Sequence, residues 1–282
     1  MNKKILLGTI KKFKILSFFF IKRIITLFKK YKSENLTVNK IVDSLEEKSF
    51  YYYPNFYSSH EIRLIKDELE EVERHCKEDN KYIKRDLTID KQRYFVKNYK
   101  TKEIQKFVQN SLILDVSKHF HRVVSPVEKT TYEIKKPGNN PEKPNLRDVK
   151  DDTVFFHFDR PYKVLKTMLL LEDVENKDGP FQIVSGSHKL SYKSPIRKIL
   201  KYISKIFFYN HHYLLAHKDE KNFINKDDII HCVGKKGDLY LVNTEAWHCG
   251  RPLEKNGYRK VIWNYIYSDC FKNWVKQLSF KN

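Results

Sequence analysis

The hydrophobic and polar positions of this chain follow two periods, one helical and one strand-like. In residues 59–77 and 101–121, apolar side chains recur at steps of three and four, which predicts two amphipathic helices. Ser58 or Ser59 is suited to cap the first of them. From residue 123 onward the apolar runs become short, and turn residues separate them. The pattern therefore predicts a mainly β fold with flanking helices.

The strand candidates are numerous enough for most of a barrel. A short aromatic strand is predicted at Phe50–Tyr53, and a second strand at residues 123–135. Further candidates lie at residues 154–159, 164–171, 181–184, 229–233, 238–243 and 259–267. The polar segment 136–152 is predicted to be a loop. Strands of this length and spacing favour a β-helix barrel.

Residues 1–35 fall outside this pattern and predict a basic amphipathic N-terminal helix. Four of its lysines follow one line of the helix, and Ile, Leu and Phe side chains lie opposite them. Lys22 and Arg23 interrupt its apolar span, which is shorter than the roughly 20 residues of a membrane crossing. No small-residue cleavage site follows, so a secretory signal is not predicted. We expect residues 1–32 either to lie on an anionic membrane surface or to dock on the protein or a partner subunit.

A second basic amphipathic helix is predicted within an insertion at residues 189–228. Pro195 suits the first position of a helix, and the positions after it carry both apolar and basic side chains. Such a helix packs its apolar face on the barrel, closes over a substrate as a lid or touches a membrane. The first alternative is the simpler one.

Composition and charge narrow the class of protein. A chain of 282 residues with 40% hydrophobic content can bury one sizeable core, so residues 36–282 are predicted to form one domain. The net charge is +20, but residues 1–32 hold ten basic residues and no acidic one. Because the excess gathers in this tail and no nucleic-acid motif is present, nucleic-acid binding is disfavoured. The four cysteines lack paired spacing, which indicates reduced thiols in a cytoplasm.

The candidate chemistry begins at residues 155–159, which read Phe-Phe-His-Phe-Asp. In an extended strand His157 and Asp159 share a face, so both can reach one metal ion. A carboxylate among phenylalanines is costly unless it is paired or bound to a metal. His248, at the end of a later strand-like run, is the candidate third ligand. Two imidazoles and one carboxylate form the facial triad of non-haem Fe(II) oxygenases.

Arg259 supplies a permanent cation eleven residues beyond His248. It begins an alternating face with Val261, Trp263 and Tyr265, so its guanidinium is predicted to point into the barrel. An unpaired arginine there is unfavourable, so an anionic partner is expected. The fork shape of the guanidinium suits a carboxylate.

In their order along the chain, these motifs resemble the phytanoyl-CoA dioxygenase family. The His-x-Asp motif is followed by a strand at residues 166–174 and by the segment 178–188, which reads DGPFQIVSGSH. The distal histidine and the arginine complete the order, and the resemblance covers roughly residues 40 to 270. It implies a double-stranded β-helix core and a dioxygenase that uses Fe(II), 2-oxoglutarate and O2 on a small-molecule substrate.

The resemblance also implies roles for the site residues. His157, Asp159 and His248 bind Fe(II), and Arg259 holds the distal carboxylate of 2-oxoglutarate. Halogenating relatives lack the carboxylate ligand, so the presence of Asp159 favours hydroxylation. His188 is a structural residue of the turn.

One position departs from the family pattern. Relatives often carry a hydroxyl two residues after the distal histidine, where this chain has Gly250. The candidates to replace it are Thr130, Thr131 and Tyr132, and Lys166 and Met168 are further candidates to line the cosubstrate pocket.

The only indication of the substrate in the sequence is a group of basic and polar residues after the metal-binding strand. Arg160, Tyr162 and Lys163 follow the metal-binding strand and are candidates to meet a phosphate- or carboxylate-bearing substrate, including a lipid-linked one. The alternative function is a catalytically silent β-helix scaffold or interaction protein at a membrane surface. The expected location is the cytoplasm, with peripheral contact on the inner membrane face.

Overall fold

The structure is a computed structural model. It describes residues 32–79, 84–88, 91–96, 101–136, 156–159, 163–189, 192, 224–254 and 256–267. The predictions for the basic N-terminal helix, for most of the 136–152 loop and of the 189–228 insertion, and for Arg160 and Tyr162 lie outside the described residues.

The described chain builds two antiparallel sheets. The larger has the strand order β1 (Phe50–Tyr53), β8 (Leu239–Asn243), β5 (Val164–Leu170), β10 (Arg259–Tyr267), β4 (Val127–Lys135), β3 (Lys91–Phe95) and β2 (Lys84–Thr88). The smaller has the order β7 (Ile229–His231), β6 (Phe181–Val184) and β9 (His248–Gly250). From β4 to β10 the chain passes repeatedly between the two sheets, which confirms the mainly β class and the double-stranded β-helix.

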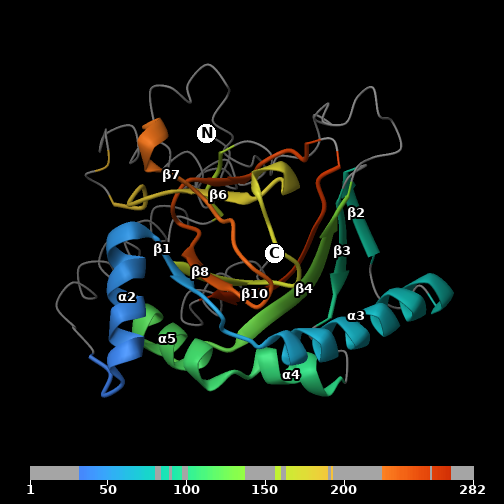
Figure 1. Ribbon diagram of the computed structural model, residues 1–282. Coiled ribbons are helices and arrows are strands. Elements are labelled where there is room, and N and C mark those ends of the chain that lie inside the picture. Colours follow the sequence, from blue (N-terminus) through green and yellow to red (C-terminus); the bar gives the residue numbers. More distant parts are fainter. Residues whose placement is uncertain are drawn as a thin grey trace, which may run out of the picture.

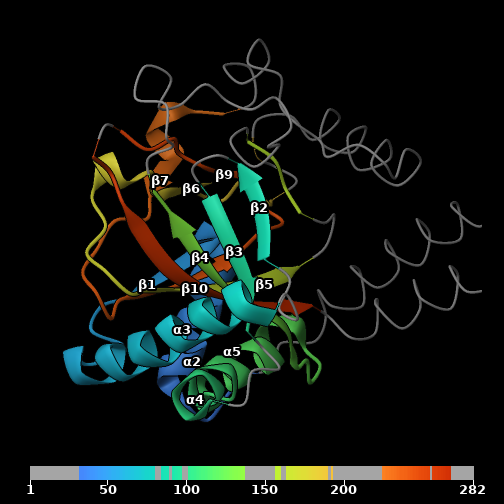
Figure 2. The same ribbon diagram turned by 90° about the vertical axis from the view of Figure 1, so that its right-hand side faces the viewer.

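Among the described residues, four helices cover the outer face of the larger sheet (Figures 1 and 2). They are α2 (Leu36–Lys48), α3 (Ser59–Asp79), α4 (Lys102–Val108) and α5 (Ser111–His121). Short 3-10 turns occur at Asn176–Asp178 and Lys226–Asp228. The predicted helix faces are confirmed: Ile62, Ile65, Leu69 and Val72 of α3 are all buried. Each such buried side chain stabilises the fold by about 1.5–3 kcal/mol.

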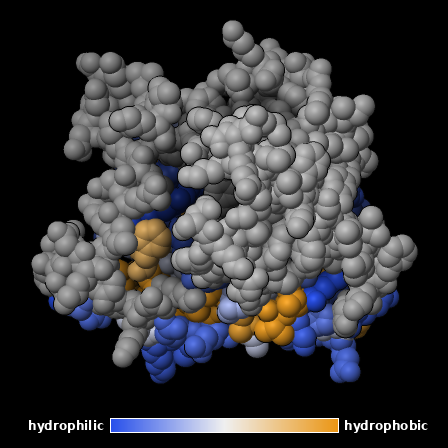
Figure 3. Space-filling model, turned by 180° about the vertical axis from the view of Figure 1, so that it is seen from behind, coloured by the Kyte–Doolittle hydropathy of each residue, from blue (hydrophilic) through white to orange (hydrophobic). Residues whose placement is uncertain are grey.

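Two hydrophobic layers follow from the alternation of side chains along the strands. One face of the larger sheet packs against the helices, with Leu165, Leu169 and Ile262 among its buried residues. The opposite face packs against the smaller sheet through Met168, Val261 and Phe181. This second layer is the barrel interior, and the candidate chemistry lies in it. On the molecular surface, hydrophobic side chains of the described part lie among hydrophilic ones (Figure 3).

The structure corrects the single helix predicted at residues 101–121. It divides into α4 and α5 at Gln109 and Asn110. The Asn110 side chain accepts a hydrogen bond from the backbone N–H of Ile113, so it caps a new helix rather than continuing the old one. The apolar spacing continued across the break and concealed it.

The strand predicted at residues 154–159 is also corrected. Within its described part, Phe156 to Asp159, only His157 forms a β-bridge, and its partner is His248. The chain leaves the ladder after His157, because the Asp159 N–H donates to the Thr244 carbonyl at 3.0 Å. The sequence pattern also missed α2, β2, β3 and β9. Asn35 caps α2, and its apolar residues at helical spacing were a usable signal.

Candidate metal centre

Backbone pairing brings the two histidines of the candidate site together. The His157 N–H donates to the His248 carbonyl at 2.9 Å, and the reciprocal bond is 2.8 Å. The ring centroids lie 4.4 Å apart. Phe156 and Phe158 point to the other side, into a buried cluster with Trp247, as the alternation predicted. The bridge therefore fixes both imidazoles on the inner side of the barrel.

Asp159 completes a cluster with the spacing of a metal site. One potential ligand atom from each of His157, Asp159 and His248 lies within 4.8 Å of the others. Both histidines are buried, whereas the Asp159 side chain is 24% exposed. The structure thus assembles the three ligands that the sequence predicted.

The hydrogen bonding of His248 prepares it to bind a metal. Its Nδ1 lies 2.9 Å from the Ala246 carbonyl, which can only accept, so Nδ1 carries the proton. In the neutral ring the lone pair is then on Nε2. This atom is buried and has no hydrogen-bond partner among the described residues. Nε2 faces the Asp159 Oδ1 at 3.7 Å. A histidine whose other nitrogen is fixed by a carbonyl is the usual form of a metal ligand.

The charge state of Asp159 also suits a metal. Burial disfavours its ionised form, but Lys166, His248 and His157 outweigh burial and hold the pKa of the carboxyl well below its usual value. The Lys166 Nζ lies 2.6 Å from the Asp159 Oδ2. The site therefore offers a carboxylate oxygen and imidazole nitrogens, which are suitable ligand types for Fe(II).

Arg259 points into the barrel and has an anionic partner, as expected. The partner is a side chain of this protein, whereas the resemblance implied the carboxylate of 2-oxoglutarate. Its Nη2 donates to Glu133 Oε1 of β4 at 2.7 Å, and its Nη1 donates to the Gly179 carbonyl. Glu133 also accepts from Arg93 of β3. Although burial opposes its ionisation, Arg93 and Arg259 hold the pKa of Glu133 far below its usual value. Sequence reasoning missed Glu133.

The Nε of Arg259 is a candidate donor for 2-oxoglutarate. Arg259 Nε is buried and has no hydrogen-bond partner among the described residues. Thr131 and Met168 face the same interior, because both lie opposite Trp263 in the sheet. The Thr131 hydroxyl is buried and likewise has no hydrogen-bond partner in the described part of the chain. These donors fit a carboxylate, so the cosubstrate roles of Arg259, Thr131 and Met168 stay predictions consistent with the geometry.

Three predicted site residues point elsewhere. The Tyr132 hydroxyl donates to Glu73 of α3 at 2.7 Å, and the Thr130 hydroxyl donates to Asn264 under the helices at 2.7 Å. Both flank the inward-facing Thr131, and neighbours on a strand point to opposite faces. Lys163 pairs with Glu46 at 2.6 Å and lies over the Phe120 ring. The structure therefore does not bring Tyr132, Thr130 and Lys163 to the metal cluster.

His188 has the structural role that was predicted. Its Nδ1 lies 2.6 Å from the Ser49 hydroxyl, and its Nε2 lies 3.0 Å from the Glu46 carbonyl. Both contacts join the turn after β6 to the end of α2. The residue is thus separate from the metal cluster.

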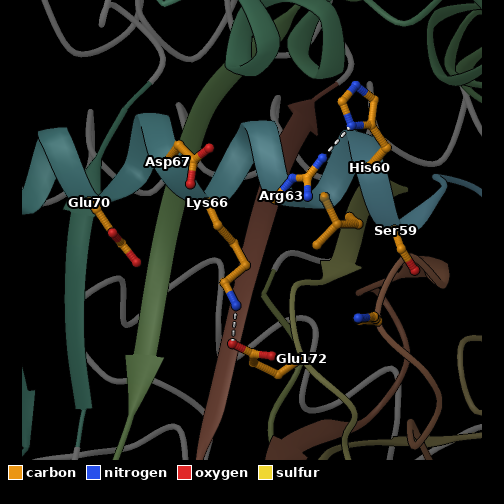
Figure 4. Close-up of a pocket in the computed structure, with 9 residues that line it drawn as sticks. Ser59, His60, Arg63, Lys66, Asp67, Glu70 and Glu172 are labelled. Atoms are coloured by element: carbon orange, nitrogen blue, oxygen red, sulfur yellow. Dashed lines mark hydrogen bonds and ion pairs between the residues drawn. The ribbon is translucent and has the colours of Figure 1, made fainter.

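A surface hollow of about 580 Å³ lies away from the triad, against α3 (Figure 4). Its lining residues are Ser59, His60, Ile62, Arg63, Lys66, Asp67, Glu70, Glu172 and Lys236. Lys66 pairs with Glu172 at 2.6 Å, and Arg63 lies 2.9 Å from the His60 ring. It contains none of the triad residues, so we assign it no part in the chemistry.

Known structures share this fold. The carbocyclase SnoK from nogalamycin biosynthesis, a non-haem α-ketoglutarate-dependent enzyme, aligns with a TM-score of 0.56 and 16% identity, over 84% of this chain and 86% of its own. HygX from Streptomyces hygroscopicus, with nickel, 2-oxoglutarate and hygromycin B bound, aligns with a TM-score of 0.54 and 13% identity. The alignment covers 82% of this chain and 86% of HygX. The epimerase SnoN aligns with a TM-score of 0.53 and 11% identity, over 82% of each chain. At these identities the similarity concerns the fold. Comparison with curated protein sequences gave no match.

The sequence match is to a family model. The model described as phytanoyl-CoA dioxygenase (PhyH) matches residues 48–261, a range that contains all three triad residues and Arg259. It also contains β4 to β9 and the start of β10, which build the barrel. The chain therefore belongs to the phytanoyl-CoA dioxygenase family of Fe(II)- and 2-oxoglutarate-dependent oxygenases.

Proposed function

We propose that this protein hydroxylates an aliphatic carbon of a small, anionic or lipid-linked substrate. The observation that carries the proposal is the cluster of His157, Asp159 and His248, in which His248 Nε2 faces a carboxylate oxygen inside the barrel. Bound iron and 2-oxoglutarate supply the activation of O2 and the oxidation of a C–H bond, with decarboxylation of the cosubstrate to succinate. The carboxylate ligand favours hydroxylation over halogenation.

The chain's own residues hold and orient these groups. Arg259 is proposed to receive the distal carboxylate of 2-oxoglutarate through Nε, which has no hydrogen-bond partner among the described residues, with help from the Thr131 hydroxyl. Glu133 and the Gly179 carbonyl fix the plane of the guanidinium. Trp263 and Phe181 pack beside the site at 5.2 Å between ring centroids, so they help to exclude water from it.

Charge on the inner face supports an anionic substrate. Lys129 and Lys166 lie over the Tyr265 ring, at 4.8 Å and 4.7 Å from its centroid. Tyr265 belongs to the inner hydrophobic layer, so both ammonium groups lie on the barrel side of the sheet. Because Lys166 is paired with Asp159, a phosphate or carboxylate placed here would gain its charge-assisted hydrogen bond from Lys129.

Turnover assays with paired substrates test this function. The protein is supplied with Fe(II), 2-oxoglutarate, O2 and anionic compounds or their neutral esters, and succinate and product mass are measured. We expect coupled succinate formation and a product with one added oxygen atom, preferentially from the anionic member. A product with unchanged mass, or one that has lost two hydrogen atoms, would instead indicate epimerisation or ring closure. Equal turnover of neutral substrates contradicts the anionic class, and absence of succinate with every substrate favours the silent scaffold.

We also propose that residues 1–32 hold the protein on the inner face of an anionic membrane, in the cytoplasm. The support is their basic amphipathic pattern. No helix in the described ranges has the length and apolar character needed to cross a membrane. Full-length protein is expected to float with anionic vesicles, and a variant lacking residues 1–32 is expected to stay in solution. Equal flotation of both proteins would reject the anchor and favour the docked helix.

A further inference from the structure

We propose that Lys166 positions Asp159 so that only one carboxylate oxygen, Oδ1, is available to the metal. This inference rests on the proposed function of the triad as the iron site. It assigns Lys166 to the orientation of a ligand, whereas the sequence suggested a place in the cosubstrate pocket. The argument depends on the different partners of the two carboxylate oxygens.

The two oxygens of Asp159 face different groups. Oδ1 lies 3.7 Å from the His248 Nε2, which is on the metal side of the cluster. Oδ2 lies 2.6 Å from the Lys166 Nζ and forms an ion pair with it. The contact is one of charge, because Oδ2 has no hydrogen-bond partner among the described residues. A carboxylate held in this way presents one oxygen to the triad and has the other engaged by the ammonium.

The ammonium itself is held in place by the sheet. Lys166 lies on β5 directly opposite Tyr265 of β10 and Val242 of β8. Its side chain is only 11% exposed, and its Nζ lies 4.7 Å from the centroid of the Tyr265 ring. The ring face attracts a cation and so restricts where the ammonium can lie. Its position is therefore set by strand register rather than by a flexible surface contact.

The mode of carboxylate binding matters for the reaction. A carboxylate can bind a metal through one oxygen or through both. If Asp159 used both, it would occupy a position that the facial triad leaves open for the cosubstrate or O2. Lys166 prevents this by competing for Oδ2. Lys166 is thus a positioning residue, because it acts on the metal through Asp159.

The hydration of bound Mn(II) tests the proposal without turnover. Mn(II) suits a site of carboxylate and imidazole ligands and relaxes the protons of water bound to it. The variant Lys166→Met retains the stem and removes the charge, and Lys166→Gln is a second neutral variant. We expect both to lose one metal-bound water relative to wild type, because Asp159 then binds through both oxygens. We also expect 2-oxoglutarate affinity for the Mn(II) protein to fall by roughly 10–100-fold, as for other residues that orient a metal ligand.

Two further variants serve as controls. Lys129→Met removes the other cation over the Tyr265 ring and is expected to keep the wild-type hydration. Lys166→Arg retains the positive charge beside Oδ2 and is expected to keep the wild-type hydration. Unchanged hydration of Mn(II) in both neutral variants would contradict the positioning role of Lys166. It would not contradict the assignment of the iron site. Loss of 2-oxoglutarate affinity with unchanged hydration would return Lys166 to the cosubstrate pocket. If wild type binds no Mn(II), the proposed iron site fails as well.

Discussion

Replacement of Asp159 by alanine is expected to abolish metal binding and succinate formation together. The substitution removes the ionised ligand, and it leaves Lys166 beside the remaining imidazoles without its carboxylate partner. The metal therefore loses a ligand, and the positive charge of Lys166 beside it is no longer balanced by a carboxylate. Affinity for Fe(II) or Co(II) should fall by more than the roughly 10–100-fold cost of losing an outer-shell partner. Calorimetric titration with Co(II) measures the effect.

Matched variants separate this loss from a general effect of mutation. Asp173 is an exposed carboxylate that pairs with Lys235, and His231 is a partly exposed histidine bonded to Gln182 and Asn176. Asp173→Asn and His231→Ala are expected to bind Co(II) like wild type, whereas His157→Ala and His248→Ala should resemble Asp159→Ala. Wild-type affinity in Asp159→Ala would refute the assignment of the triad.

Replacement of Glu133 by alanine is expected to lower the free energy of unfolding by about 3–5 kcal/mol, the usual cost of removing one partner of a buried ion pair. Arg259 is 3% exposed and Glu133 2%, so the arginine would stay buried without its carboxylate. Urea unfolding measures the change. As a control, Glu172→Ala removes the partner of the more exposed Lys66 and should cost about 0–1 kcal/mol. Equal losses in the two variants would contradict the importance of the buried pair.

The pH dependence of stability gives an independent test of the same pair. Because the pKa of Glu133 is lower in the folded protein, its ionised form contributes stability that is complete above the unfolded pKa of about 4.3. This contribution is lost as the pH falls toward the folded pKa. Wild type should therefore lose more stability than Glu133→Gln between neutral pH and acid. Parallel losses would show that Glu133 is not ionised in the fold.

The triad could be predicted from the sequence because its chemistry is local. His157 and Asp159 lie two residues apart, and a carboxylate in an apolar run requires a partner wherever the strand lies. His248 then followed from its place at the end of a strand. The structure adds what a sequence cannot give, namely the bridge between His157 and His248 and the contact of Lys166 with Asp159.

The partner of Arg259 could not be predicted in the same way. Glu133 reaches Arg259 because β4 lies beside β10, and Arg93 joins them because β3 lies beside β4. Such register is set by tertiary packing. Tyr132 shows a related difficulty. Its strand was predicted correctly, but side chains alternate between the two faces, so an error of one residue exchanges the inward-facing and outward-facing positions. The break at Asn110 did have a local signal, since asparagine is a strong helix cap, but the apolar spacing that continues across it concealed that signal.

The central claim is that His157, Asp159 and His248 bind iron together with 2-oxoglutarate. Anaerobic titration of the protein with Fe(II) and 2-oxoglutarate tests it most directly, through the metal-to-ligand charge-transfer band in visible light. We predict that the band appears in wild type, is unchanged in Asp173→Asn and is absent from His157→Ala and Asp159→Ala. A folded wild-type protein without the band, or a band that persists in Asp159→Ala, would contradict the account.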